Sequence, residues 1–144
     1  MADDSEVMEE LLQALDNEKN DSIMGMTSQR IKGAKNDILQ RLQIKGPELK
    51  VLHKKLKNYR YCAEPKDLRY GFYIRWIPLK NPDKLYLTNG GIICDFKIID
   101  KQLHVVCKNN YNHLMQVKFD ESIIFQKLSN QERVILDILD YLDK

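Results

Sequence analysis

The sequence predicts an α+β protein: N-terminal helices that include an αα-hairpin, then a small five-stranded antiparallel sheet or SH3-like barrel, then a capping C-terminal helix. Two observations predict this class. Apolar residues recur at three- and four-residue spacing towards both ends of the chain, which is typical of amphipathic helices. Between about residues 68 and 128, short alternating segments are separated by turn-forming residues, which is typical of a small antiparallel sheet.

The composition is that of one compact domain with an appended helical arm. Of the 144 residues, 43% are hydrophobic and 31% are charged, which is enough apolar material for a core without disulfides. We divide the chain into a helical arm (residues 1–60) and a compact β domain with its C-terminal helix (residues 61–144). The three cysteines form no CxxC pair and the N-terminus is acidic, so we expect a soluble intracellular protein in a reducing compartment. No run reaches the roughly 18 apolar residues of a membrane helix, so we expect no membrane partner.

Charge is distributed unevenly along the chain. Residues 1–21 carry a net charge of −7 and residues 30–60 a net charge of +8, whereas the whole chain carries +2. Residues 61–119 carry +4 and residues 120–144 carry −3. Such asymmetry indicates either a basic contact surface or neutralisation between the two ends.

The helical arm is expected to hold an acidic helix and a basic αα-hairpin. Apolar residues at helical spacing predict the acidic helix over residues 4–16. The basic hairpin, residues 27–59, has its N-cap at Thr27 or the next residue, breaks at Lys45-Gly46-Pro47 and ends near Tyr59. So short a break favours two antiparallel helices, although a continuous kinked arm or a dimeric coiled coil fits the same pattern.

The β region begins after Glu64-Pro65, a dipeptide that disfavours a continuing helix. The segments with strand composition are 72–79, 84–87, 91–108, 113–119 and 122–128. In the first of these, Phe72, Ile74 and Trp76 share one face, and Tyr73, Arg75 and Ile77 share the other. Turn-forming residues separate the segments, which predicts a strongly bent sheet or a small barrel.

The segment 91–108 is the clearest structural signal and predicts a hairpin about Asp100-Lys101. Pairing its two arms places Ile98 opposite Leu103, Phe96 opposite Val105 and Cys94 opposite Cys107, all on one apolar face that Ile92 extends. Facing cysteines can form a disulfide. In a reducing compartment, two buried thiols are the favoured interpretation.

A final helix is predicted over residues 130–143. Ser129 and Glu132 match a capping box, and the apolar face is formed by Ile135, Ile138, Leu139 and Leu142. We expect this helix to cover an open side of the sheet.

The sequence offers little catalytic chemistry. No pair of Cys or His has the spacing of a zinc site, so we predict no metal and no cofactor. The glycines of Thr88-Asn89-Gly90-Gly91 lead into a strand, whereas phosphate-binding glycine loops lead into a helix. Nucleotide-binding and hydrolase motifs of the GKS/T, GxSxG and HExxH types do not occur. We therefore predict that the protein is not an enzyme.

The basic segment is the strongest functional feature. Lysines recur on the third helix, and aromatic residues interleaved with arginines follow at once, a combination that binds single-stranded nucleic acid. The candidate nucleic-acid-binding residues are Lys50, Lys54, Lys55, Lys57, Arg60, Tyr61, Arg69, Tyr73 and Arg75. The competing interpretation is an ordinary solvated helix face that the acidic N-terminal helix neutralises.

Part of the chain also resembles a group of viral proteins. The runs 59–61, 71–79, 87–92 and 124–128, together with a composition rich in Lys, Asn and Ile, resemble uncharacterised small proteins of giant nucleocytoplasmic DNA viruses. The resemblance covers about residues 59–143. It implies a product of the infected-cell cytoplasm or the virion, and it implies no activity and no site residues.

These observations favour a non-enzymatic protein-interaction or assembly protein, with the helical arm as the partner-binding element. The expected partner is another protein or a second copy of the chain. The alternative function is nucleic-acid binding through the basic helices, residues 30–60, and the Tyr/Arg-rich segment, residues 59–76.

Overall fold

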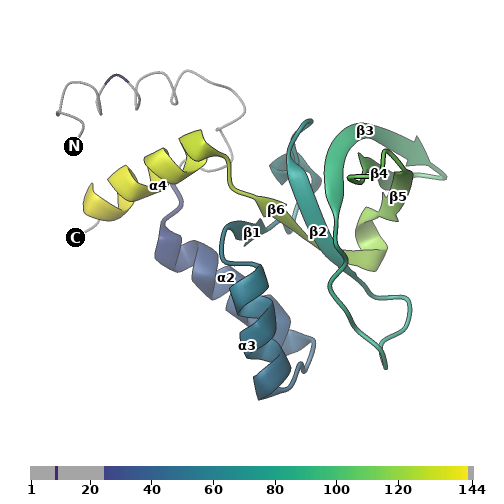
Figure 1. The fold of residues 1–144 in the computed structure, drawn as a ribbon, viewed down its shortest axis with the longest axis horizontal. Coiled ribbons are helices and arrows are strands. Elements are labelled where there is room, and N and C mark those ends of the chain that lie inside the picture. Colours follow the sequence, from purple (N-terminus) through teal and green to yellow (C-terminus); the bar gives the residue numbers. More distant parts are fainter. Residues whose placement is uncertain (1–8, 10–24, 143–144) are drawn as a thin grey trace.

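The structure is a computed structural model that describes residue 9 and residues 25–142. The acidic helix predicted for residues 4–16 lies outside the described residues except for Glu9. In the described part, the chain forms three α-helices and a six-stranded antiparallel sheet, so the predicted α+β class is confirmed (Figure 1). The helices are α2 (Ser28–Arg41), α3 (Gly46–Lys55) and α4 (Asn130–Leu142). The strands are β1 (Tyr59–Tyr61), β2 (Tyr73–Pro78), β3 (Gly91–Ile99), β4 (Gln102–Lys108), β5 (Leu114–Lys118) and β6 (Ser122–Lys127).

The helices α2 and α3 form the predicted αα-hairpin. The Thr27 side chain caps α2 by accepting a hydrogen bond from the Arg30 backbone N–H at 3.1 Å. Pro47 lies in the first turn of α3, where its missing N–H costs nothing. The prediction that α3 continues to Tyr59 is wrong, because the helix ends at Lys55 and Tyr59 already pairs with Lys127 in the sheet.

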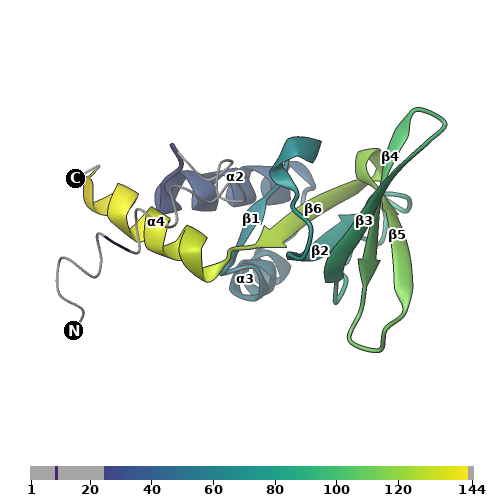
Figure 2. The same cartoon turned by 90° about the horizontal axis from the view of Figure 1, so that it is seen from above.

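The sheet is open, with strand order β1-β6-β2-β3-β4-β5 and antiparallel pairing throughout. The sequence analysis missed β1, and its segment 84–87 forms no strand; the sheet has six strands where five were predicted. Pairing between β2 and β3 is confined to two residue pairs at Tyr73 and Ile74, so the sheet bends there. In Figure 2 the strands β3, β4 and β5 run across the direction of β1, β6 and β2.

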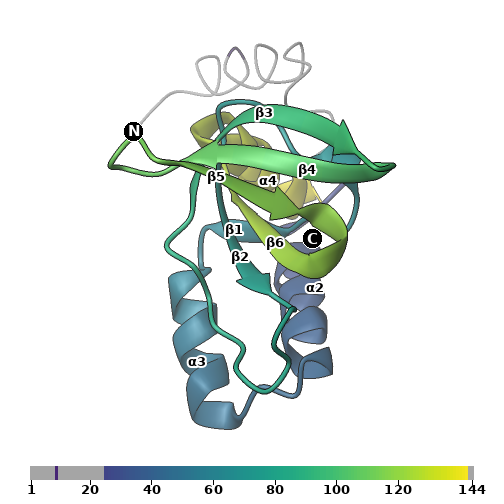
Figure 3. The same cartoon turned by 90° about the vertical axis from the view of Figure 1, so that its right-hand side faces the viewer.

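The bent sheet has an apolar core on each side of β2. Ile74 and Trp76 belong to a core inside the bend with Val105 and Val117. Residues on the opposite face of β2, Ile77 among them, belong to a second core beneath the αα-hairpin. Its buried members are Leu39, Leu56, Tyr59, Ile77 and Phe125. Figure 3 shows α2 and α3 side by side against this part of the sheet. The face alternation predicted for the first strand is thus confirmed.

The helix α4 lies on α2, and the prediction that it covers the sheet is wrong. The capping box is confirmed, since the Ser129 hydroxyl accepts from the Glu132 N–H and the Glu132 carboxylate accepts from the Ser129 N–H. Ile135 and Leu136 of α4 are buried against Ile31 of α2. The predicted place of Leu142 on the apolar face is wrong, since it is 70% exposed. Figure 1 shows α4 running away from the sheet. A periodic apolar stripe predicts that a helix buries one face, but it does not identify the surface that covers this face.

The β3–β4 hairpin turns at Asp100-Lys101 as predicted, with φ values of 52° and 66°. The predicted pairs Phe96–Val105 and Ile98–Leu103 are confirmed. The predicted burial of Ile98 is wrong, since its side chain is 71% exposed. The pairing of Cys94 with Cys107 is wrong, because a β-bulge between Ile93 and Asp95 shifts the register by one residue. Ile93 therefore lies opposite Cys107 in the core, whereas Cys94 is exposed. The predicted contribution of Ile92 to the apolar face is also wrong, since its side chain is 47% exposed.

This register predicts a single fast-reacting thiol. Burial raises the pKa of Cys62 to about 12 and that of Cys107 to about 11, so both stay protonated at pH 8, and the thiolate is the reactive form. We expect one of the three thiols to react rapidly with an aromatic disulfide reagent at pH 8 under native conditions. The Cys94→Ser variant should lose this fast phase. A fast phase that persists in this variant would contradict the bulged register.

Candidate protein-binding groove

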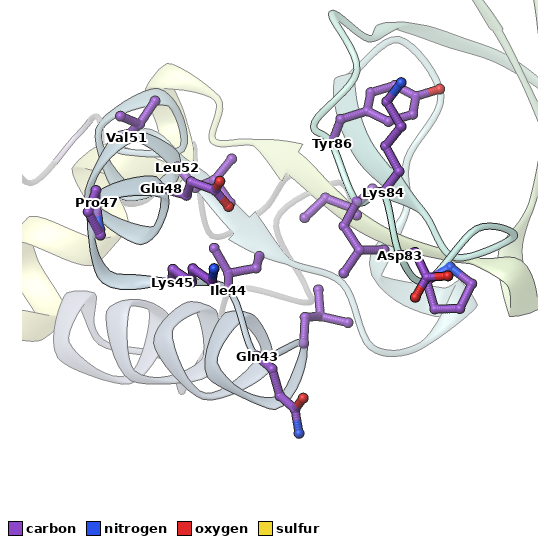
Figure 4. Close-up of a pocket in the computed structure, with 14 residues that line it drawn as sticks. Gln43, Ile44, Lys45, Pro47, Glu48, Val51, Leu52, Asp83, Lys84 and Tyr86 are labelled. Atoms are coloured by element: carbon purple, nitrogen blue, oxygen red, sulfur yellow. The ribbon is translucent and has the colours of Figure 1, made fainter.

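A groove of about 690 Å³ separates the αα-hairpin from the loop that connects β2 to β3. We call it the hairpin–loop groove. One wall is formed by the α2–α3 turn and α3, and the other by residues 82–86 of the loop (Figure 4). Its apolar lining residues are Leu42, Ile44, Pro47, Val51, Leu52, Ile77, Pro82, Leu85 and Tyr86. The volume lies within the range of about 300–1,000 Å³ that is typical of ligand pockets.

The helical wall follows from the way in which α2 ends and α3 begins. Leu42 forms the C-cap of α2, and Gln43 takes a positive φ of 59°, which reverses the chain. Ile44 is then half-buried against the core beneath the hairpin. On α3, Leu49, Leu52 and Leu56 contact this core, whereas Val51 lies off this stripe and is 51% exposed.

The loop wall is held against β2 by apolar and polar contacts. The side chains of Leu85 and Leu87 pack on the core beneath the hairpin. Thr88 fixes the end of the loop: its N–H donates to the Trp76 carbonyl at 2.9 Å, and its hydroxyl accepts from the Trp76 N–H at 3.2 Å. The strand predicted over residues 84–87 is wrong, because these residues form a loop between β2 and β3 that reaches the β2 backbone through Thr88.

Gly90 allows the loop to return to the sheet. Its φ is +86°, and a Cβ at this position would lie 2.0 Å from the Ile74 carbonyl oxygen. Only glycine fits so close an approach with this backbone conformation. Tyr73 supports the same turn, since its hydroxyl donates to the Asn89 carbonyl at 2.6 Å.

The groove combines an exposed apolar surface with a rim of balanced charge. Val51 on α3 and Tyr86 on the loop are 51% and 59% exposed, on opposite walls. The helical wall carries Lys45 and Glu48, and the loop wall carries Asp83 and Lys84. Figure 4 shows Leu52 and Glu48 on one side, facing the loop that bears Asp83, Lys84 and Tyr86 on the other. Such a site suits an apolar protein segment better than a polyanion.

The structure divides the predicted nucleic-acid-binding residues into two groups. Four of them are exposed on or directly after α3, namely Lys50, Lys54, Lys55 and Lys57. In the described part of the chain, none of these four makes an ion pair. Lys57 directly follows Leu56, the C-cap of α3, and the other three lie on the helix itself.

The second group is bonded within the fold. Arg60 is 4% exposed and donates to the Asp67 carbonyl at 3.0 Å. The half-buried ring of Tyr61 lies 6.0 Å from that of Phe125, and Arg75 donates to the Thr88 carbonyl at 2.8 Å. Arg69 likewise donates to backbone carbonyls nearby, and Tyr73 to that of Asn89. These hydrogen bonds hold loops to the sheet. Tyr73 and Arg75 also line an open pocket of about 870 Å³, whose aromatic lining includes Tyr59, Trp76, Tyr86 and Tyr111.

Sequence reasoning missed the groove residues. One sequence signal for the groove was available: Val51 is apolar but lies off the stripe formed by Leu49, Leu52 and Leu56. On the other wall, the alternation of Leu85 and Leu87 predicted a strand. Because of that prediction, Tyr86 was not recognised as an exposed loop residue.

Comparison of the chain with protein-family models, with curated proteins and with solved structures found no match. The resemblance to giant-virus proteins therefore stays a prediction. Among the residues that the structure describes, no helix is long and apolar enough to cross a membrane. Within the same residues, no group of three His, Cys, Asp or Glu side chains is arranged to hold a metal ion.

Proposed function

We propose that the protein is a non-enzymatic interaction module that binds an amphipathic helical segment of a protein partner in the hairpin–loop groove. The observation that carries this proposal is an apolar groove whose two walls each bear an exposed apolar side chain, Val51 on α3 and Tyr86 on the loop. Exposed apolar surface with a polar rim marks interaction sites. The helical arm, which we propose as the partner-binding element, supplies one wall of this groove.

The lining of the groove supports a helix as the occupant. Peptides that bind by strand addition need a free sheet edge, and the edge strands β1 and β5 contribute nothing to this lining. An amphipathic helix needs only an apolar trough with polar margins. The balanced rim of Lys45, Glu48, Asp83 and Lys84 suits the mixed polar flanks of such a helix.

A peptide selection on the full-length protein tests this function. A random library of 15-residue peptides should yield sequences in which apolar residues recur at three- and four-residue spacing. Sedimentation of the protein alone tests whether a second copy of the chain is the partner. Selected peptides without helical apolar periodicity, or no selected peptides at all, would contradict the proposal.

We further propose that the strands form an SH3-like arrangement. Support comes from the order β6-β2-β3-β4-β5, in which the last strand of a five-stranded meander returns beside the first. A 3₁₀ turn at Phe119–Glu121 precedes this last strand. The resemblance to giant-virus proteins supports a setting in the infected-cell cytoplasm or the virion.

Nucleic-acid binding is the second candidate function. It is favoured by the exposed lysines Lys50, Lys54, Lys55 and Lys57, which lie close together along the chain and face solvent. Lysines so placed neutralise phosphates and make affinity depend strongly on salt.

For this second function, we expect replacement of Lys50, Lys54 and Lys57 together by Glu to abolish binding of single-stranded nucleic acid. With three phosphate contacts, binding by the parent protein should weaken about 20-fold between 50 and 200 mM salt. Fluorescence anisotropy over a salt series measures both effects. Binding that persists in the triple variant would remove this helix as the site.

A further inference from the structure

A second, smaller pocket lies where α2 and α4 meet the segment that follows α3. Its volume is about 120 Å³. Four of its lining residues are basic, namely Lys32, Lys35, Lys57 and Arg133. The acidic residue of the lining is Asp137. In the described part of the chain, none of these five side chains makes an ion pair.

Lys35 is the buried member of this set. It is 4% exposed, and its ammonium donates one hydrogen bond, at 2.8 Å, to the Leu56 carbonyl at the C-terminal end of α3. An ammonium group has three N–H donors, and the described residues supply it with this single acceptor. A buried cation needs further polar or anionic partners to offset its desolvation.

The electrostatics around Lys35 favour an anion in the pocket. Burial, and then the nearby charge of Lys32, lower the pKa of Lys35. Lys57 and Arg133 approach the pocket from exposed positions, so their side chains can close around a ligand that enters from solvent. An anion bound in the pocket would raise the pKa of Lys35, because a neighbouring negative charge favours the protonated amine.

We propose that this pocket binds a single phosphate group, held by Lys35 together with Lys32, Lys57 and Arg133. The small volume suits one tetrahedral oxyanion. The planar fork of an arginine matches phosphate oxygens, and lysines bind the same group as point charges. Asp137 opposes the ligand and limits its affinity. The proposal is independent of peptide binding in the hairpin–loop groove.

Titration of the full-length protein with inorganic phosphate tests this site. We expect saturable binding that raises the pKa of Lys35, followed by NMR of its side chain. Lys57→Gln and Arg133→Gln should each weaken phosphate binding about tenfold or more, because each removes a charge-assisted hydrogen bond. Asp137→Asn should strengthen binding several-fold. Lys97→Gln is the matched control, since Lys97 is an exposed lysine on β3, outside the pocket and outside the basic helices, and it should leave binding unchanged.

The carrier of the phosphate group is identified by a second arm of the same experiment. A single-stranded oligonucleotide that competes with phosphate, and that binds more weakly to Arg133→Gln, identifies a nucleic-acid strand. Phosphate binding without oligonucleotide binding identifies a free phosphate compound. The proposal is overturned if phosphate does not bind, or if Asp137→Asn and Lys57→Gln affect binding no more than Lys97→Gln does. Lys35 would then act only as a cap of the α3 carboxyl end.

Discussion

The Leu39→Ala variant should have a free energy of unfolding about 2–5 kcal/mol below that of the parent protein. Leu39 is 0% exposed and belongs to the core that joins α2 to the sheet, with Leu56, Ile77 and Phe125. Truncation removes apolar contacts and leaves a cavity that a rigid helix–sheet interface cannot fill. Urea denaturation with a two-state fit measures the change.

Leu142→Ala is the matched control for this prediction. Leu142 is also a helical leucine, but it is 70% exposed at the end of α4, so its truncation should change the free energy of unfolding by less than about 0.5 kcal/mol. Equal effects of the two substitutions would mean that α2 is not docked on the sheet. The helical wall of the groove would then have no fixed position.

The Tyr86→Ala variant should bind a selected amphipathic peptide about 30-fold more weakly than the parent protein does. Buried interface tyrosines often contribute 2 kcal/mol or more, which corresponds to this factor. Tyr86 is 59% exposed in the free protein, so a bound helix can bury its ring against the apolar wall opposite. Because it is a surface side chain, its removal should leave the unfolding midpoint nearly unchanged.

Tyr141→Ala provides the matched comparison for Tyr86→Ala. Tyr141 is 74% exposed on α4 and does not line the groove. Isothermal titration calorimetry should give the parent affinity for this variant. If both tyrosine variants bind the peptide as the parent does, the groove is not the binding site.

The sequence determines much of the sheet, because alternation fixes which side chains share a face. In β2, the split between Ile74 with Trp76 and Tyr73 with Ile77 corresponds to two cores on opposite sides. Alternation fails at Cys94 because the bulge inserts one residue. Ile92 and Ile93 are both apolar, so either register presents an isoleucine to the core.

Errors at the boundaries of helices and strands arise at residues that fit the apolar pattern of either of two secondary structures. Tyr59 falls on the apolar stripe that the sequence predicts for α3. In the structure, its side chain is buried as the first residue of β1. Leu85 and Leu87 alternate as a strand does, but they lie in a loop and pack on the core beneath the hairpin. Both outcomes depend on contacts that are distant in sequence, such as the pairing of Tyr59 with Lys127.

The candidate site was predictable only in part. The α3 lysines lie off the apolar stripe of their helix, so the sequence predicts that they are exposed. The structure confirms this for Lys50 and Lys54. The partners of Arg60 and Arg75 are backbone carbonyls whose positions depend on loop geometry. The groove itself forms between segments some 35 residues apart, so no local pattern reveals it.

Mapping of a selected peptide onto the isotope-labelled full-length protein by NMR tests the central claim most directly. Binding in the hairpin–loop groove predicts backbone shift changes concentrated in residues 42–52 and 82–86. Perturbations confined to β3, β4 and β5, or to α4, would contradict the proposed function.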